Sequence, residues 1–112
     1  MEITSQADGL VTIVRISGRI DFATSESLEQ VVCAIIAGGR PRVILDMRGV
    51  EYISSAGLRA ILIAARKAKS AGGGIAIFGL QPGVDEVFTT SGFGKVVPLV
   101  PSVAAARQIL SA

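Results

Sequence analysis

The fold of this chain is limited above all by the way short apolar runs alternate with segments of helical periodicity. Residues 43–46, Val-Ile-Leu-Asp, are a short apolar run that ends in Asp46 and is typical of a buried central strand. The segment before them instead repeats apolar residues at the spacing of one helical face, at Leu28, Val31, Val32, Ile35 and Ile36. Such alternation predicts an α/β domain with a mostly parallel sheet and right-handed crossovers.

The first residues predict an antiparallel hairpin. Residues 10–16 mix alternation with β-branched side chains, and residues 2–6 can form the partner strand. Between them, Ala7-Asp8-Gly9 carries the Asp-Gly signature of a hairpin turn. The helix that follows should begin at a capping residue, Thr24 or Ser25, and end at two glycines.

The rest of the chain continues the alternation. After the central strand we expect a loop over residues 47–53 and a helix from about Ser54-Ser55 to residues 71–74. Residues 75–78 predict a strand, Pro82 opens a third helix, and residues 96–99 predict a last strand that Pro98 places at a sheet edge. Ser102 should cap a final helix. We therefore expect one domain over residues 1–112, with about five strands and four helices, mostly on one face of the sheet.

Composition excludes several classes of function. The 112 residues carry 11 Lys and Arg against 9 Asp and Glu, a net charge of +2 that is too small for a nucleic-acid footprint. The chain has no histidine, which excludes Ser-His-Asp catalysis, Cys-His catalysis and histidine metal sites in their usual forms. The single cysteine, Cys33, allows no internal disulfide. No apolar run reaches the ~20 residues that span a bilayer. We expect no catalytic residues, no metal and no cofactor.

Glycine-rich stretches do not change this expectation. Residues 71–74 and 91–95 run into predicted strands, whereas a phosphate-binding loop precedes a helix. Both stretches are interpreted as helix ends.

Two carboxylates follow predicted strands. Asp21 and Asp46 could lie at the same carboxyl edge of the sheet, where α/β proteins often bind ligands, and such a pair could hold Mg²⁺. Alternatively, Asp21 caps a helix or turn and Asp46 braces the loop after it. Asp46 and Lys95 also faintly suggest a receiver-like phosphoacceptor domain. That site needs a further acidic pair after the first strand, and Ile16-Ser17-Gly18 offers none.

The strongest local signal is the serine pair Ser54-Ser55, at the predicted start of a helix. One serine can serve as an N-cap, because its oxygen accepts a hydrogen bond from a free backbone N–H. The same helix end attracts anions, so a phosphate on serine would be tolerated there. The residues alone leave both interpretations open.

Four segments in order resemble the STAS domains of anti-sigma-factor antagonists. Residues 43–69 (VILDMRGVEYISSAGLRAILIAARKAK) resemble the family's central segment, with its D-S-x-G motif before a helix. Residues 18–24 (GRIDFAT) look like its G-x-hydrophobic-D-x-x-T/N element. Residues 77–84 and 87–93 resemble the later strand-to-helix turn and the late helix. The resemblance implies a STAS-type α/β fold and a cytoplasmic regulatory protein that is not an enzyme.

The resemblance also implies a phosphorylation site. The family's phosphorylated serine maps to Ser55, and its acidic position near the acceptor, which supports kinase recognition, maps to Asp21. This chain departs from the pattern at Ser54, where the family has Asp, and at Arg59, where a small residue is common. Ser54 is therefore a minor alternative acceptor. The partner-binding surface is expected to comprise Asp21, Thr24, Ser54, Ala56, Gly57, Leu58 and Arg59.

The partners that the resemblance implies are a serine-kinase anti-sigma factor and a PP2C-type phosphatase. Unphosphorylated protein would bind the kinase and release a sigma factor, and the phosphatase would reset the cycle. We expect a monomer or weak homodimer, with no nucleic acid and no membrane as partner. A stressosome-like scaffold and a subunit of a lipid-transport complex, both STAS modules of other classes, remain alternatives.

Overall fold

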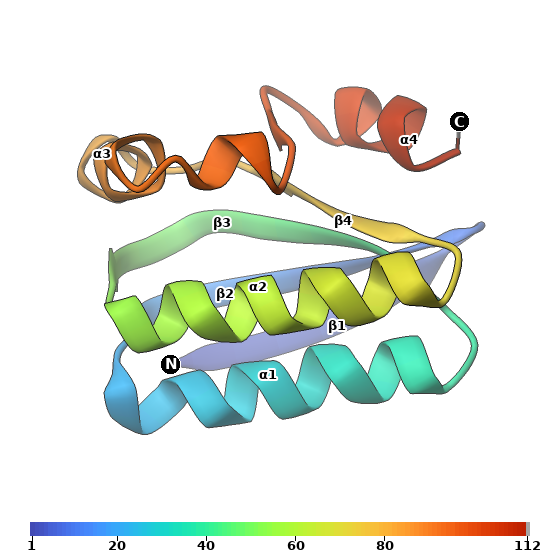
Figure 1. Cartoon of the computed structure of the whole chain (residues 1–112), viewed down its shortest axis with the longest axis horizontal. Coiled ribbons are helices and arrows are strands. Elements are labelled where there is room, and N and C mark those ends of the chain that lie inside the picture. Colours follow the sequence, from blue (N-terminus) through green and yellow to red (C-terminus); the bar gives the residue numbers. More distant parts are fainter. Residues whose placement is uncertain (112) are drawn as a thin grey trace.

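A computed structural model describes residues 1–111 and has the expected order of elements (Figure 1). The elements are β1 (Glu2–Asp8), β2 (Val11–Ile20), α1 (Phe22–Ala37), β3 (Arg42–Ile53), α2 (Ser55–Ser70), β4 (Gly74–Phe78), α3 (Pro82–Thr90), the 3-10 helix η1 (Phe93–Lys95), β5 (Leu99–Val100) and α4 (Val103–Ser111). The strands lie in the order β1-β2-β3-β4-β5. β1 pairs antiparallel with β2, and the other pairs are parallel. The predicted mixed sheet with four helices is confirmed.

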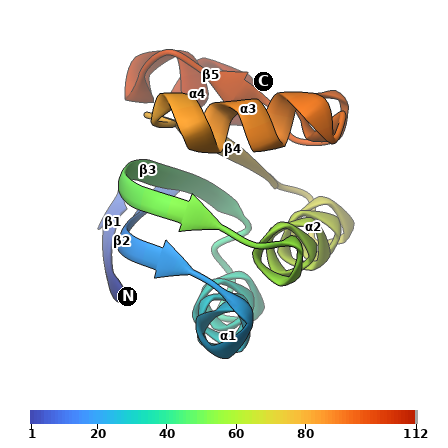
Figure 2. The ribbon, with the colours of Figure 1, turned by 90° about the vertical axis from the view of Figure 1, so that its left-hand side faces the viewer.

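The helices divide unequally between the two faces of the sheet. In β3, Val43 and Leu45 belong to the larger core cluster, which also holds buried side chains of α1, α2 and α3. Ile44, between them, points to the other face and packs in a smaller cluster with Ala106 and Leu110 of α4. α1 and α2 lie side by side, and Figure 2 views them end on. Most of β1 is left exposed.

The loop predicted over residues 47–53 is wrong, because β3 continues as a strand to Ile53. Met47, Val50 and Ile53 are buried in the larger core, while the polar residues between them face outward. Two register shifts against β2 break the regular alternation that would have marked this segment as a strand.

Two boundaries also differ from prediction. The N-cap of α1 is Asp21, not Thr24 or Ser25. The last strand covers Leu99–Val100 instead of residues 96–99, because η1 and its cap occupy the chain as far as Val96. β5 pairs only with β4, so the predicted edge position is correct. Ser102 accepts a hydrogen bond from Ala105 N at 3.1 Å, as predicted for a cap.

Candidate functional site: two adjoining helix starts

The ends of β2 and β3 bring two helix N-termini together. Ile20 and Ile53 are paired across these parallel strands, so the residues that follow them, Asp21 and Ser54, emerge at the same edge. The backbone N–H of Ser54 donates to the carbonyl of Ile20 at 2.8 Å, which ties the two connections to each other. Figure 2 shows the arrowheads of β2 and β3 leading into α1 and α2. The edge therefore presents two sets of free backbone N–H groups.

The two serines of α2 have different surroundings. Ser54 is the N-cap: it has an extended backbone, and its Oγ accepts from Gly57 N at 3.1 Å. Ser55 is the first residue of the helix, and it is exposed. Within residues 1–111 the Ser55 hydroxyl has no hydrogen-bond partner. One serine is thus occupied by the helix cap, and the other is open to an incoming group.

Asp21 and Thr24 form a capping box at the start of α1. Thr24 N donates to Asp21 Oδ1 at 3.0 Å, and Asp21 N donates to Thr24 Oγ1 at 2.9 Å. The Thr24 hydroxyl donates to the carbonyl of Arg19 at 2.9 Å and also lies 3.1 Å from Asp21 Oδ1. The hydrogen bonds from the Thr24 backbone and side chain lower the pKa of Asp21. Asp21 is therefore an ionised carboxylate at neutral pH, on the chain segment bonded to the start of α2.

Close packing holds α2 against the strand ends. Gly57 is buried, and a Cβ on it would lie 2.7 Å from Ile20 Cγ2 and 2.8 Å from Ile53 Cγ1. No larger residue fits there without displacing these side chains. The other predicted site residues on α2 follow its helical turn: Ala56 and Leu58 are half-buried, and Arg59 is exposed.

Sequence reasoning missed two exposed aromatic residues at this edge. Phe22, the first residue of α1, is 86% exposed, and Tyr52, next to the end of β3, is 41% exposed. The guanidinium carbon of Arg19 lies 4.3 Å from the centre of the Tyr52 ring. The spacing of Asp21 and Thr24 matches a capping box, which places Phe22 on the first helical residue, and this spacing was the signal that could have found Phe22.

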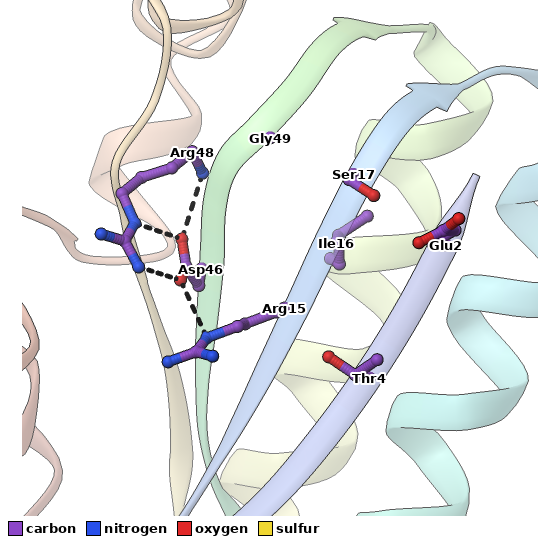
Figure 3. Close-up of a pocket in the computed structure, with 8 residues that line it drawn as sticks. All are labelled: Glu2, Thr4, Arg15, Ile16, Ser17, Asp46, Arg48 and Gly49. Atoms are coloured by element: carbon purple, nitrogen blue, oxygen red, sulfur yellow. Dashed lines mark hydrogen bonds and ion pairs between the residues drawn. The ribbon is translucent and has the colours of Figure 1, made fainter.

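Asp46 does not belong to this site, so the edge pair with Asp21 that the sequence left possible is wrong, and the alternative, that Asp21 caps a helix, is confirmed. Asp46 lies within β3, opposite Arg15 of β2, and only 4% of it is exposed. Arg48 binds both of its carboxylate oxygens, at 3.0 and 2.8 Å (Figure 3). Burial raises the pKa of Asp46, but the hydrogen bonds and positive charge of Arg48 outweigh burial and lower it. This arrangement argues against a receiver-like phosphoacceptor, and Lys95 lies in η1.

Among residues 1–111, no group of three or more Asp, Glu and Cys side chains is placed to hold a metal ion. None of the helices in this part of the chain combines the length and the apolar character required to cross a bilayer.

Comparison with known proteins gives consistent matches. The family model of the STAS domain matches residues 2–106. The proposed anti-sigma factor antagonist BtrV of Bordetella bronchiseptica is 37% identical over 107 residues, which are 95% of this chain and 91% of BtrV. The anti-sigma F factor antagonist of Paenibacillus polymyxa is 30% identical over 90 residues, 80% of this chain and 77% of that protein. The crystal structure of an anti-sigma factor antagonist from Mycobacterium paratuberculosis superimposes with a TM-score of 0.88 at 25% identity, covering 99% of this chain and 94% of its own.

Proposed function

This chain belongs to the STAS domain family, and we propose that it is an anti-sigma factor antagonist controlled by phosphorylation of Ser55. The relatives that cover most of its length carry the name of anti-sigma factor antagonist. In the proposed cycle, the unphosphorylated protein binds a serine-kinase anti-sigma factor in the cytoplasm, and the sigma factor is released. The protein is the substrate of the kinase and has no catalytic residue of its own.

The observation that carries this proposal is the difference between the two serines. Ser54 Oγ accepts the hydrogen bond that caps α2, while the Ser55 hydroxyl is exposed. Transfer of the γ-phosphoryl group from ATP would form a bond from phosphorus to Ser55 Oγ, release ADP and free the hydroxyl proton. The product at the helix start is tolerated, because free N–H groups and the helix dipole favour an anion there.

The same phosphate would weaken partner binding. It adds about −1.5 to −2 charges at pH 7 to an interface that includes the ionised Asp21. A partner that covers this edge would have to remove water from two neighbouring negative groups of this chain, and the phosphate loses hydration when it is buried. A PP2C-type phosphatase would hydrolyse the ester and restore the binding form.

Phe22 and Tyr52 extend the proposed partner surface beyond the polar residues. Aromatic side chains are enriched among the residues that dominate binding energies, and the ring of Phe22 stands almost fully in water. Asp21, Thr24, Arg59 and the start of α2 would form the polar part of the contact. We expect the helix starts, and not the far ends of α1 and α2, to face the kinase.

Titration calorimetry with the cognate anti-sigma factor kinase tests the proposal. Ser55→Ala should bind with wild-type affinity, and Ser55→Asp should bind about tenfold more weakly or worse, because the carboxylate imitates part of the phosphate charge. Ser70→Asp is the control and should bind as wild type, since it adds the same charge at the exposed far end of α2, outside the proposed contact. Equal affinity of Ser55→Asp and wild type would contradict the proposed switch.

A further inference from the structure

The sheet face opposite α1 and α2 carries a hollow separate from the helix starts. It has a volume of about 500 Å³ and is lined by residues of β1, β2 and β3, chiefly Glu2, Thr4, Arg15, Ser17, Asp46 and Arg48. α4 covers this face only farther along the strands, at Ile44, Ala76 and Phe78. The floor of the hollow includes the point where β3 bulges, since Arg15 pairs with Asp46 but Ser17 pairs with Gly49.

Arg48 is held in place from several directions, although its side chain is 63% exposed. Its backbone N–H, Nε and Nη2 all donate to Asp46, at 3.1, 3.0 and 2.8 Å. Its guanidinium carbon lies 5.3 Å from the centre of the Phe78 ring. A Cβ on Gly79 would lie only 2.3 Å from Arg48 Cγ, and Gln81 Nε2 donates to the Arg48 carbonyl at 2.9 Å.

Arg15 completes an exposed pair of cations. Its Nε lies 3.5 Å from Asp46 Oδ2, and its side chain is also 63% exposed. Figure 3 shows Arg15 and Arg48 approaching Asp46 from two strands, with Glu2 across β2 on β1. Within residues 1–111, Asp46 is the one carboxylate that makes an ion pair with either arginine. Two guanidinium groups around one carboxylate leave a net positive charge, and part of their N–H donors stays free.

We propose that this hollow is a second docking surface, which binds a carboxylate-bearing segment of a partner protein through Arg15 and Arg48. Arginine is suited to the role because its planar guanidinium matches a carboxylate and can donate two parallel hydrogen bonds. Asp46 acts as a positioning residue. It orders both arginines before binding, so that less side-chain freedom is lost when the partner arrives.

The shape of the hollow favours a protein segment over a small molecule. Small ligands are usually enclosed on most of their surface, whereas this hollow is an open stretch of sheet. An extended segment would present alternate side chains to one face, which suits recognition over neighbouring strands. Glu2 stands on the far side of the hollow, so the segment should carry its carboxylates toward Arg15 and Arg48 and not form a long acidic run. The surface is independent of phosphorylation at Ser55.

The experiment is an NMR titration of the full isotope-labelled chain with a capped Gly-Glu-Gly-Glu-Gly peptide, with Gly-Gln-Gly-Gln-Gly as the control peptide. The Nε–H signals of Arg15 and Arg48 should shift with the acidic peptide and not with the control. The dissociation constant for the acidic peptide should rise about tenfold in Arg48→Gln, because half of the cationic pair is lost. Arg66→Gln, an exposed charge on α2, should bind as wild type.

Because Arg48→Gln leaves Asp46 buried without its main partner, Glu2→Gln provides a variant outside the ion pairs. It should tighten binding by removing repulsion at the edge of the hollow. Equal shifts at Arg66 or Arg107, or equal binding of the two peptides, would overturn the proposal. Shifts at Arg15 and Arg48 on concentrating the protein alone would assign the hollow to a second copy of the chain and would also overturn it.

Discussion

At the start of α2, Ser54 and Ser55 have the same hydroxyl group but different neighbours. The Ser54 hydroxyl satisfies the backbone N–H of Gly57, which otherwise lacks a partner within the helix. The Ser55 hydroxyl, one residue on, is exposed. The sequence left a helix cap as one of two open interpretations of the serine pair, and the local backbone geometry decides which serine caps the helix.

This difference predicts effects of unequal size for two alanine substitutions on stability. Ser54→Ala should lower the free energy of unfolding by about 1 kcal/mol, because the N-cap hydrogen bond is lost. Ser55→Ala should change it by no more than about 0.5 kcal/mol, as is usual for exposed positions. Urea denaturation followed by circular dichroism measures both. A larger loss for Ser55→Ala than for Ser54→Ala would contradict the assignment of the cap.

Gly57 gives a second prediction for a single residue. Gly57→Ala should lower the free energy of unfolding by about 1–3 kcal/mol, because the added methyl group overlaps Ile20 and Ile53. Gly83→Ala is the matched control in α3, where a Cβ meets nothing within 4 Å. The control should be neutral or stabilising, since alanine favours helix over glycine. Thermal unfolding of the two variants compares them directly, and equal melting temperatures would refute the close packing of α2.

At the scale of elements, the capping box at the start of α1 makes the stability of the fold depend on pH. Hydrogen bonds from Thr24 lower the pKa of Asp21 in the folded chain, so the folded state binds this proton less readily than the unfolded state. The stabilisation from Asp21 is therefore present above the unperturbed aspartate pKa of about 4 and is lost as the pH falls below it. Asp46 acts in the same direction, because its pKa is also lowered.

Asp21→Asn isolates the contribution of the cap. Asparagine is also a good N-cap but does not titrate, so this variant should lose less stability than wild type between about pH 5 and pH 2. The measurement is the free energy of unfolding by urea at a series of pH values. Identical pH profiles for the two proteins would show that Asp21 does not titrate differently in the folded state.

The two halves of β3 show where prediction from sequence succeeds. Residues 43–46 were recognised because both faces of the strand are covered there, which makes the run continuously apolar. Residues 47–53 were missed because one face is open and the bulge shifts the alternation. The Asp46–Arg48 pair was missed for a related reason: residues 46 and 48 share one face of β3 only because the strand continues past Asp46, and this continuation was predicted as a loop.

At the scale of the whole molecule, element order and sheet topology can be predicted from patterns along the chain. The set of residues that share one surface cannot be predicted in the same way. Asp21 and Ser54 were expected on one partner-binding surface, because the resemblance to STAS domains implies it. Phe22 was not included, although Asp21-Phe22-Ala23-Thr24 has capping-box spacing and places the ring on the first helical residue. Its ring is exposed because no other element within residues 1–111 covers it.

The exposure of Phe22 predicts that its substitution lowers partner affinity without lowering the stability of the fold. Phe22→Ser should weaken binding to the anti-sigma factor kinase by more than about 1 kcal/mol, because an interface aromatic is lost. Its free energy of unfolding should stay within about 0.5 kcal/mol of wild type. Leu10→Ser is the control, an exposed apolar residue in the hairpin turn at the opposite end of β2. Binding is measured by calorimetry, and equal affinities for the two variants would show that Phe22 does not belong to the interface.

The central claim is that Ser55 accepts the phosphate, and fragment-ion mass spectrometry tests it most directly. After incubation with the cognate kinase and ATP, trypsin releases residues 49–59, which contain both serines, so fragmentation within this peptide must separate them. The account predicts phosphate on Ser55, unchanged labelling of Ser54→Ala and no labelling of Ser55→Ala. Phosphate on Ser54 alone, or on neither serine while the kinase is active, would contradict it.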